Sequence, residues 1–137
     1  MSISRHPFTP GPPVQLQAKP PPLFISSRVA ESGGSIRLVL AGELDLVARD
    51  RFATDLDLAQ HESDRVLLDL RALVLIGCSC LATLFAAARR ARLEGGALIL
   101  LDPRDQVRRM LDLVGPPPDV AVLEAGDLLE LRAAATA

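Results

Sequence analysis

The amino-acid sequence predicts an α/β domain in which a mixed sheet of about five strands packs against about four helices. Two observations lead to this prediction. Short apolar runs alternate with amphipathic segments along the chain, and clusters of glycine or proline separate them. The chain has 137 residues, which falls within the usual size of one domain. We therefore expect residues 23–137 to form this domain.

Residues 1–22 have a different character from the rest of the chain. They lack periodic hydrophobicity and are rich in proline, which occurs at positions 7, 10, 12, 13, 20, 21 and 22. Because proline fixes φ and removes a backbone donor, this composition predicts a disordered or extended tail. Docking of the tail on an aromatic groove of a partner is the alternative.

Five segments have the composition of strands, namely residues 23–29, 36–41, 65–70, 97–101 and 120–123. The first two flank Gly33 and Gly34, which permit a hairpin turn, so these strands should pair antiparallel. The third and fourth are continuous apolar runs, typical of strands that are covered on both faces. We expect these two in the middle of the sheet and the last at an edge.

Four segments are expected to be helical, at about residues 47–61, 79–94, 103–114 and 128–135. In the third, Asp102 is the predicted N-cap and Pro103 the first helical residue. The first three contain apolar residues at helical spacing: Ala48, Phe52, Leu56 and Ala59; Leu81, Leu84, Phe85 and Ala88; and Val107, Met110, Leu111 and Val114. The pattern leaves open whether the helices cover one face of the sheet or both.

The composition argues against several classes of function. The formal net charge is −2 and aromatic residues make up 3%, so the basic and stacking surface of a nucleic-acid binder is missing. No apolar run reaches the roughly 18 residues of a membrane span, and no secretory signal is visible, so we expect a cytoplasmic protein. Two histidines and two cysteines do not supply a zinc site. We expect no metal, no cofactor and no enzymatic activity, because no histidine base accompanies a serine nucleophile.

Several motifs, taken in order and spacing, resemble the STAS domain family, in particular the bacterial anti-sigma factor antagonists. The resemblance covers roughly residues 23–123. The motifs are Gly42-Glu43-Leu44-Asp45, the turn at residues 75–81, the segment 89–96 that ends in Gly95-Gly96, and the helix that follows Asp102-Pro103. The resemblance implies the STAS fold and a protein that binds an anti-sigma factor of the serine-kinase type and so releases a sigma factor.

The resemblance also implies a phosphorylated serine in an Asp-Ser-Ser-Gly turn at a helix N-terminus. Aligned on Ile76 and Leu81, that aspartate falls on Gly77, the phosphorylated serine on Cys78, the second hydroxyl on Ser79 and the glycine on Cys80. Because a thiol is not the hydroxyl that a serine kinase modifies, the usual phosphoswitch is not expected. Ser79 is the remaining phosphorylation candidate, and the alternative is a plain residue at the start of the helix.

The candidate partner-binding residues are Glu43, Asp45, Gly77, Cys78, Ser79 and Cys80. Asp45 matches the family's aspartate in the first turn, and its alternative role is to cap that turn. Cys78 and Cys80 are redox candidates, because a helix N-terminus lowers thiol pKa values, or else small residues that fill a tight turn. Two functions therefore remain as alternatives to that of an antagonist. One is a non-switching STAS scaffold module in a stress-signalling or transport complex, and the other is a thiol-based redox-sensing regulator. A homodimer is also left open.

Overall fold

The sheet is mixed, with five strands in the order β1-β2-β3-β4-β5. The structure is a computed structural model and describes residues 23–124, 126 and 127. The strands are β1 (Ile25–Ala30), β2 (Ile36–Leu44), β3 (Arg65–Ile76), β4 (Ala97–Leu101) and β5 (Ala121–Leu123). β1 and β2 pair antiparallel, as predicted, and the remaining neighbours pair parallel. The two apolar runs predicted for the interior form β3 and β4, both of which have neighbours on either side.

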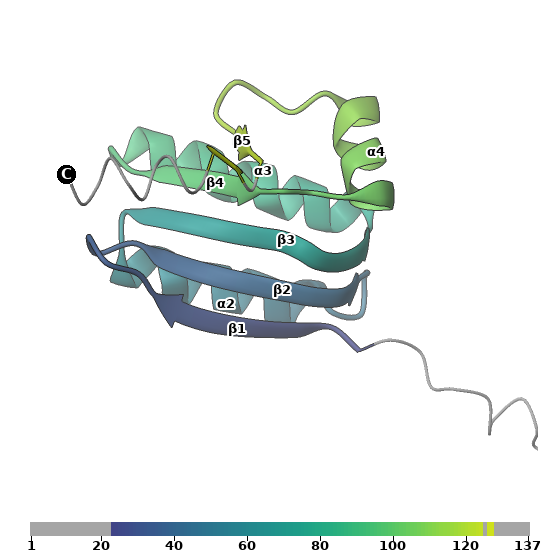
Figure 1. Cartoon of the computed structure of the whole chain (residues 1–137), viewed down its shortest axis with the longest axis horizontal. Coiled ribbons are helices and arrows are strands. Elements are labelled where there is room, and N and C mark those ends of the chain that lie inside the picture. The colour runs from purple at the N-terminus through teal and green to yellow at the C-terminus, as the bar shows by residue number, and fades with distance from the viewer. Residues whose placement is uncertain (1–22, 125, 128–137) are drawn as a thin grey trace, which may run out of the picture.

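Three helices connect the parallel strands, at α2 (Arg49–Glu62), α3 (Cys78–Leu93) and α4 (Asp105–Val114). Figure 1 shows α2 and α3 across one face of the sheet, with α4 beyond the end of β4. All three contribute buried side chains to the main core, together with alternate residues of β2, β3 and β4. The described helices therefore number three rather than four. The fourth expected helix, at residues 128–135, and the tail at residues 1–22 lie outside the described residues.

The predicted buried faces of the helices are correct in most positions. Phe52, Leu56 and Ala59 of α2 are at most 1% exposed, and Leu81, Leu84 and Ala88 of α3 are buried as well. Among the described residues, the buried core is aliphatic apart from Cys80 and two aromatic residues. The rings of these two, Phe24 and Phe52, pack edge to face with their centroids 6.3 Å apart. Val114 is an error of the prediction, because it lies 51% exposed at the end of α4.

The predicted cap of α4 is also wrong. The helix begins at Asp105 with Arg104 at the N-cap position, and no side chain caps it. Asp102 is still part of the sheet connection, since its N–H donates to Leu123 O at 2.7 Å and its φ is +51°. This bond to the strand β5 holds Asp102 outside the helix, so the turn needs two more residues before α4 can start.

β2 and β3 continue past their predicted ends, β2 from residue 41 to 44 and β3 from residue 70 to 76. Two register shifts accommodate this extension, one of them at Gly42. Gly42 has φ +89°, and a Cβ atom there would lie 1.8 Å from Leu23 O, so only glycine fits. With these bulges, the C-terminal ends of β2 and β3 reach the same end of the sheet.

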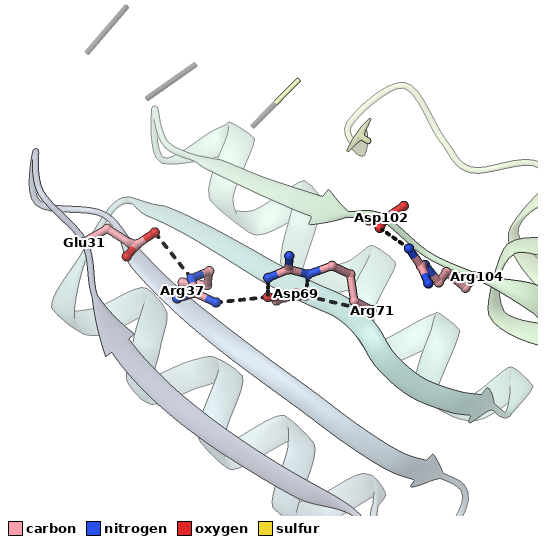
Figure 2. A network of polar contacts seen from close by, with 6 residues as sticks. All are labelled: Glu31, Arg37, Asp69, Arg71, Asp102 and Arg104. Carbon is pink, nitrogen blue, oxygen red and sulfur yellow. Dashed lines mark hydrogen bonds and ion pairs between the residues drawn. The ribbon is translucent and has the colours of Figure 1, made fainter. Parts of the chain in front are cut away.

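The face of the sheet away from α2 and α3, here called the open face, carries a row of charged side chains (Figure 2). Asp69 is 2% exposed and accepts hydrogen bonds from Arg37 Nη1 at 3.0 Å, Arg71 Nε at 2.9 Å and Arg71 Nη2 at 2.6 Å. Arg37 also donates to Glu31 at 3.3 Å. Burial by itself raises the pKa of Asp69, but the hydrogen bonds and charge of Arg71, with Arg37, outweigh it and leave the pKa below its usual value.

The lowered pKa of Asp69 predicts a contribution to the pH dependence of stability. A carboxyl whose pKa is lower in the folded state stabilises the fold above its unfolded pKa of about 4 and loses this effect as the pH falls through the folded pKa. Asp69→Asn should therefore destabilise the protein at pH 7, by on the order of 2 kcal/mol, and should lose less stability than the parent below pH 4. Urea unfolding at pH 7, 5 and 3 measures both effects. Asp57→Asn, at an exposed carboxyl on α2, is the control, and parallel pH profiles for parent and Asp69→Asn would contradict the assignment.

Candidate functional site

The two turns singled out in the sequence meet at one end of the sheet, where β2 and β3 finish. The first follows β2 and leads into α2 at residues 45–48, and the second joins β3 to α3 at residues 76–80. Because β2 and β3 are parallel neighbours, both turns lie at the same end of the sheet. Gly77 N–H donates to Leu44 O at 2.9 Å, and the Cys80 thiol donates to Asp45 O at 3.3 Å. We call residues 43–48 and 76–80 the paired turns.

The paired turns hold all six residues predicted for partner binding. Asp45 and Cys78 are exposed, Glu43, Gly77 and Ser79 are half-buried, and Cys80 is fully buried. Cys78 is the first residue of α3, and no side chain caps that end of the helix. The exposed members are therefore Asp45 on one turn and Cys78 on the other, while Cys80 lies beneath them.

The Asp45 side chain organises its own turn. Its Oδ1 atom accepts the backbone N–H groups of Val47 at 3.1 Å and Ala48 at 3.2 Å. This is the capping role that the sequence left open as an alternative to binding. Asp45 is exposed as well, so the same carboxylate can hold the turn and face solvent.

The two cysteines have different environments. Burial raises the pKa of the Cys80 thiol, an effect that a hydrogen bond with Ser79 opposes and the Asp45 carboxylate reinforces. A thiol held neutral in this way is a poor nucleophile. Cys80 therefore acts as a packing residue whose thiol also joins the two turns, and of the two redox candidates only Cys78 is exposed.

Sequence reasoning missed two apolar residues at the tip of the first turn. Leu46 is 66% exposed and Val47 is 91% exposed, and they follow directly after Asp45. The sequence contained a signal, because neither residue belongs to the apolar stripe of α2. Exposed apolar side chains beside polar groups are typical of protein-binding surfaces.

Gln106 of α4 is a second residue that the sequence did not indicate. Its side-chain amide accepts from Ile76 N–H at 2.9 Å and donates to Ile76 O at 3.3 Å. This pair of bonds attaches α4 to Ile76, which is the last residue of β3 and the first residue of the second turn. The paired turns are thus supported from both sides, by β2 and by α4.

The described residues hold no group of three or more His, Cys, Asp or Glu side chains that could bind a metal ion. Within the same part of the chain, no helix has both the length and the apolar character to cross a bilayer. The chemistry available at the paired turns is a carboxylate, a thiol, a hydroxyl and two exposed aliphatic groups. This set suits recognition of another molecule through surface contacts.

Comparison with known proteins gives one family and a group of related structures. The family model described as "Mlab, STAS domain" matches residues 27–116. The comparison with curated proteins found no match. Among solved structures, the unphosphorylated form of the anti-sigma factor antagonist SpoIIAA is 18% identical with a TM-score of 0.65, over 80% of this chain and 97% of that one.

Two further structures have similar scores. An anti-sigma factor antagonist from Mycobacterium paratuberculosis is 17% identical with a TM-score of 0.69, over 80% of this chain and 93% of that one. A putative antagonist from Thermotoga maritima is 18% identical with a TM-score of 0.66, over 78% and 92%. At these identities the likeness establishes the fold, which agrees with the predicted arrangement of strands and helices.

The different environments of the cysteines predict selective labelling. In the folded protein, Cys78 should react with iodoacetamide and Cys80 should react at least about 100-fold more slowly, because its thiol is buried and neutral. Peptide mass spectrometry over a time course measures both rates. Cys78→Ser and Cys80→Ser variants assign the signals, and addition of guanidinium should make the two rates similar. Equal rates in the native protein would contradict the described packing of Cys80.

Proposed function

Since the chain belongs to the STAS domain family, we propose that it is an anti-sigma factor antagonist that works in the cytoplasm by binding, without enzymatic activity of its own. Its partner would be an anti-sigma factor of the kinase-like type, and binding would release a sigma factor. The observation that supports this proposal most is the meeting of the Asp45 turn and the Cys78 turn at one exposed edge. Family relatives with the same fold carry the antagonist function in their names.

The partner-binding surface in this proposal consists of the exposed atoms of the paired turns. Asp45 supplies a negative charge, and Leu46 and Val47 supply apolar area that gains from burial against a partner. The turn is held by the two hydrogen bonds to Asp45 Oδ1, so little conformational freedom is lost on binding. A surface of this kind needs no cofactor.

We further propose that this protein is not switched by serine phosphorylation. The residue at the family's modified position is Cys78, which is exposed but carries a thiol. Ser79 is half-buried and lies one residue further along α3, which turns its side chain by about 100° around the helix axis. A kinase that recognises the family's turn would meet the Ser79 hydroxyl in a different direction.

A non-switching STAS scaffold in a stress-signalling or transport complex is the second candidate. The absence of the modifiable serine favours it, since a scaffold has no need of that residue. Its partner would also bind the paired turns, but no sigma factor would be released. A thiol-based regulator would have to depend on Cys78 alone, because Cys80 is buried and its pKa is raised rather than lowered.

Charge reversal at Asp45 tests the proposed surface. A pull-down with mass spectrometry identifies the partner, and calorimetry with the purified partner then measures affinity. Asp45→Lys should raise Kd by at least about 10-fold, because it reverses the charge in the proposed contact. Asp45→Asn, which keeps the acceptor for Val47 and Ala48, separates loss of charge from loss of the turn. Asp112→Lys, at an exposed position near the end of α4, is the control, and an unchanged Kd for Asp45→Lys would reject the surface.

A kinase assay tests the absence of the phosphoswitch. Incubation of the protein with its anti-sigma partner and ATP should give no stoichiometric phosphoprotein by intact-mass spectrometry. The Gly77→Asp, Cys78→Ser variant should regain phosphate, because an added Cβ at Gly77 meets nothing closer than Leu44 O at 3.7 Å and Cys78 is exposed. This variant leaves the buried Cys80 in place. Phosphate on Ser79 of the unaltered protein, abolished by Ser79→Ala, would overturn the proposal.

A further inference from the structure

The two outermost strands of the sheet differ in how open they are to a further strand. β5 has three residues, whereas β1 has six and pairs with β2 in one unbroken register. Natural proteins protect outer strands by short length, bulges, proline or charged side chains. β1 has no proline, lysine or bulge, and its single charged residue, Arg28, is paired with Glu62. Among the described residues no strand pairs with the outer side of β1, here called the β1 edge (Figure 1).

Exposed apolar side chains lie on both sides of the β1 edge. Ser26 and Arg28 bond to side chains of α2. Alternation along the strand therefore turns Ile25 and Val29 to the open face, where Ile25 is 52% exposed and Val29 is half-buried. On the helix face, Leu58 of α2 is 57% exposed and lines a hollow of about 220 Å³ between β1 and α2. Both faces of the edge thus offer apolar area to a second molecule.

The charges around this hollow are balanced. It is lined by two arginines and two carboxylates, which are Arg28, Arg51, Asp55 and Glu62. Arg28 pairs with Glu62, and Arg51 lies 3.7 Å from Asp55. Because positive and negative groups are equal in number, the surface does not repel a copy of itself, and it does not favour a partner with charges of one sign. Charge complementarity therefore favours a second copy of this chain as the occupant.

The bonds between β1 and α2 indicate where a two-fold axis can lie. They start at Ser26 and Arg28 and end at α2 residues that are about two helical turns apart. Ser27 is the midpoint on the strand, and Leu58 is close to the midpoint on the helix. The two residues therefore lie at one level of the edge, and an axis through this level brings each of them next to its own copy.

We propose that a second copy of this chain pairs with the β1 edge in antiparallel orientation, centred on Ser27, so that the two sheets join into one. Ile25 of each copy then lies opposite Val29 of the other, which gives two apolar cross-strand pairs on the open face. The two Leu58 side chains meet on the helix face. The contact is isologous, because the same surface serves both copies.

The spacing of the helices is compatible with this pairing. α2 packs chiefly against β2, and β2 and its copy would be three strand spacings, or about 14 Å, apart. Directly packed helices are about 8–10 Å apart, so there is room for long side chains between the two α2 helices. Arg28 of one copy lies opposite Ser26 of the other and thus beside Asp55 of that copy. Charges that are paired within one chain thereby gain a second partner across the axis.

The paired turns take no part in this contact, because they follow the C-terminal ends of β2 and β3. β2 and its copy run in opposite directions across the axis, so the paired turns of the two copies lie at opposite ends of the joined sheet. If the paired turns bind the anti-sigma factor, as the proposed function states, the dimer holds two partner molecules that face away from each other.

Sedimentation velocity over a concentration series tests the dimer. The full-length chain should dimerise, and Leu58→Asp should raise the dimer Kd at least about 10-fold, because two carboxylates then meet at the axis. Leu113→Asp, at an exposed residue of α4, is the matched control and should leave the dimer Kd unchanged. Thermal melting by circular dichroism confirms that both variants fold. A full-length chain that stays monomeric throughout the series would overturn the proposal.

Cross-linking tests the register. In a Cys78→Ser, Cys80→Ala background, Ser27→Cys should form a covalent dimer on oxidation, because the two thiols lie opposite each other, and Leu113→Cys should not. A dimer in sedimentation that gives no cross-link at position 27 would contradict the axis at Ser27.

Two further measurements separate this proposal from its alternatives. Leu58→Asp should bind the anti-sigma partner with unchanged Kd per chain, so a failure of the dimer and a failure of the proposed function give different results. A chain without residues 2–22 should dimerise as the full-length chain does. Dimerisation only after this deletion would assign the β1 edge to an occupant other than a second copy and would overturn the proposal.

Discussion

The parallel pairing of β2 with β3 is the constraint on which the candidate site depends. It brings two turns that are about 30 residues apart in the sequence to one edge of the sheet, and the bond from Gly77 N–H to Leu44 O holds them together. The bulges at and before Gly42 extend both strands far enough to reach that edge. Asp45, Cys78 and the exposed pair Leu46 and Val47 are neighbours for this reason, although no single one of them defines a site.

The two faces of the sheet are stabilised by different interactions. On the helix face, aliphatic side chains of every helix interlock with alternate strand residues and exclude water. On the open face, Asp69 is buried as an ion, and two arginines compensate the loss of hydration. Asp102 and Arg104 extend the row of charged side chains, with 3.4 Å between Arg104 Nη2 and Asp102 Oδ2. That buried oxygen has no hydrogen bond among the described residues.

Much of this arrangement could be predicted from local signals, and the exceptions share a cause. The hairpin, the interior position of β3 and β4 and the faces of α2 and α3 follow from periodicity and turn residues, whereas the joint use of the two turns was implied by the family resemblance. The prediction of Asp102 as an N-cap, by contrast, is wrong because the Asp102 N–H donates a hydrogen bond to Leu123 O, 21 residues away in the sequence. The burial of Asp69 and the hydrogen bonds between the Gln106 side chain and the Ile76 backbone likewise depend on contacts between distant segments. Local patterns contain no information about such partners.

The free space around Gly77 shows that the fold does not restrict every residue of the paired turns equally. Gly77 has φ −89°, which any residue adopts, and a Cβ there would make only ordinary contacts with Leu44 O and the Cα atom of Asp45. Gly42, in contrast, is required by the fold, since its neighbour Leu23 leaves no room. The fold therefore restricts the residue at position 42 but not the residue at position 77. A side chain at position 77 would change the surface of the second turn without any rearrangement of the core beneath it.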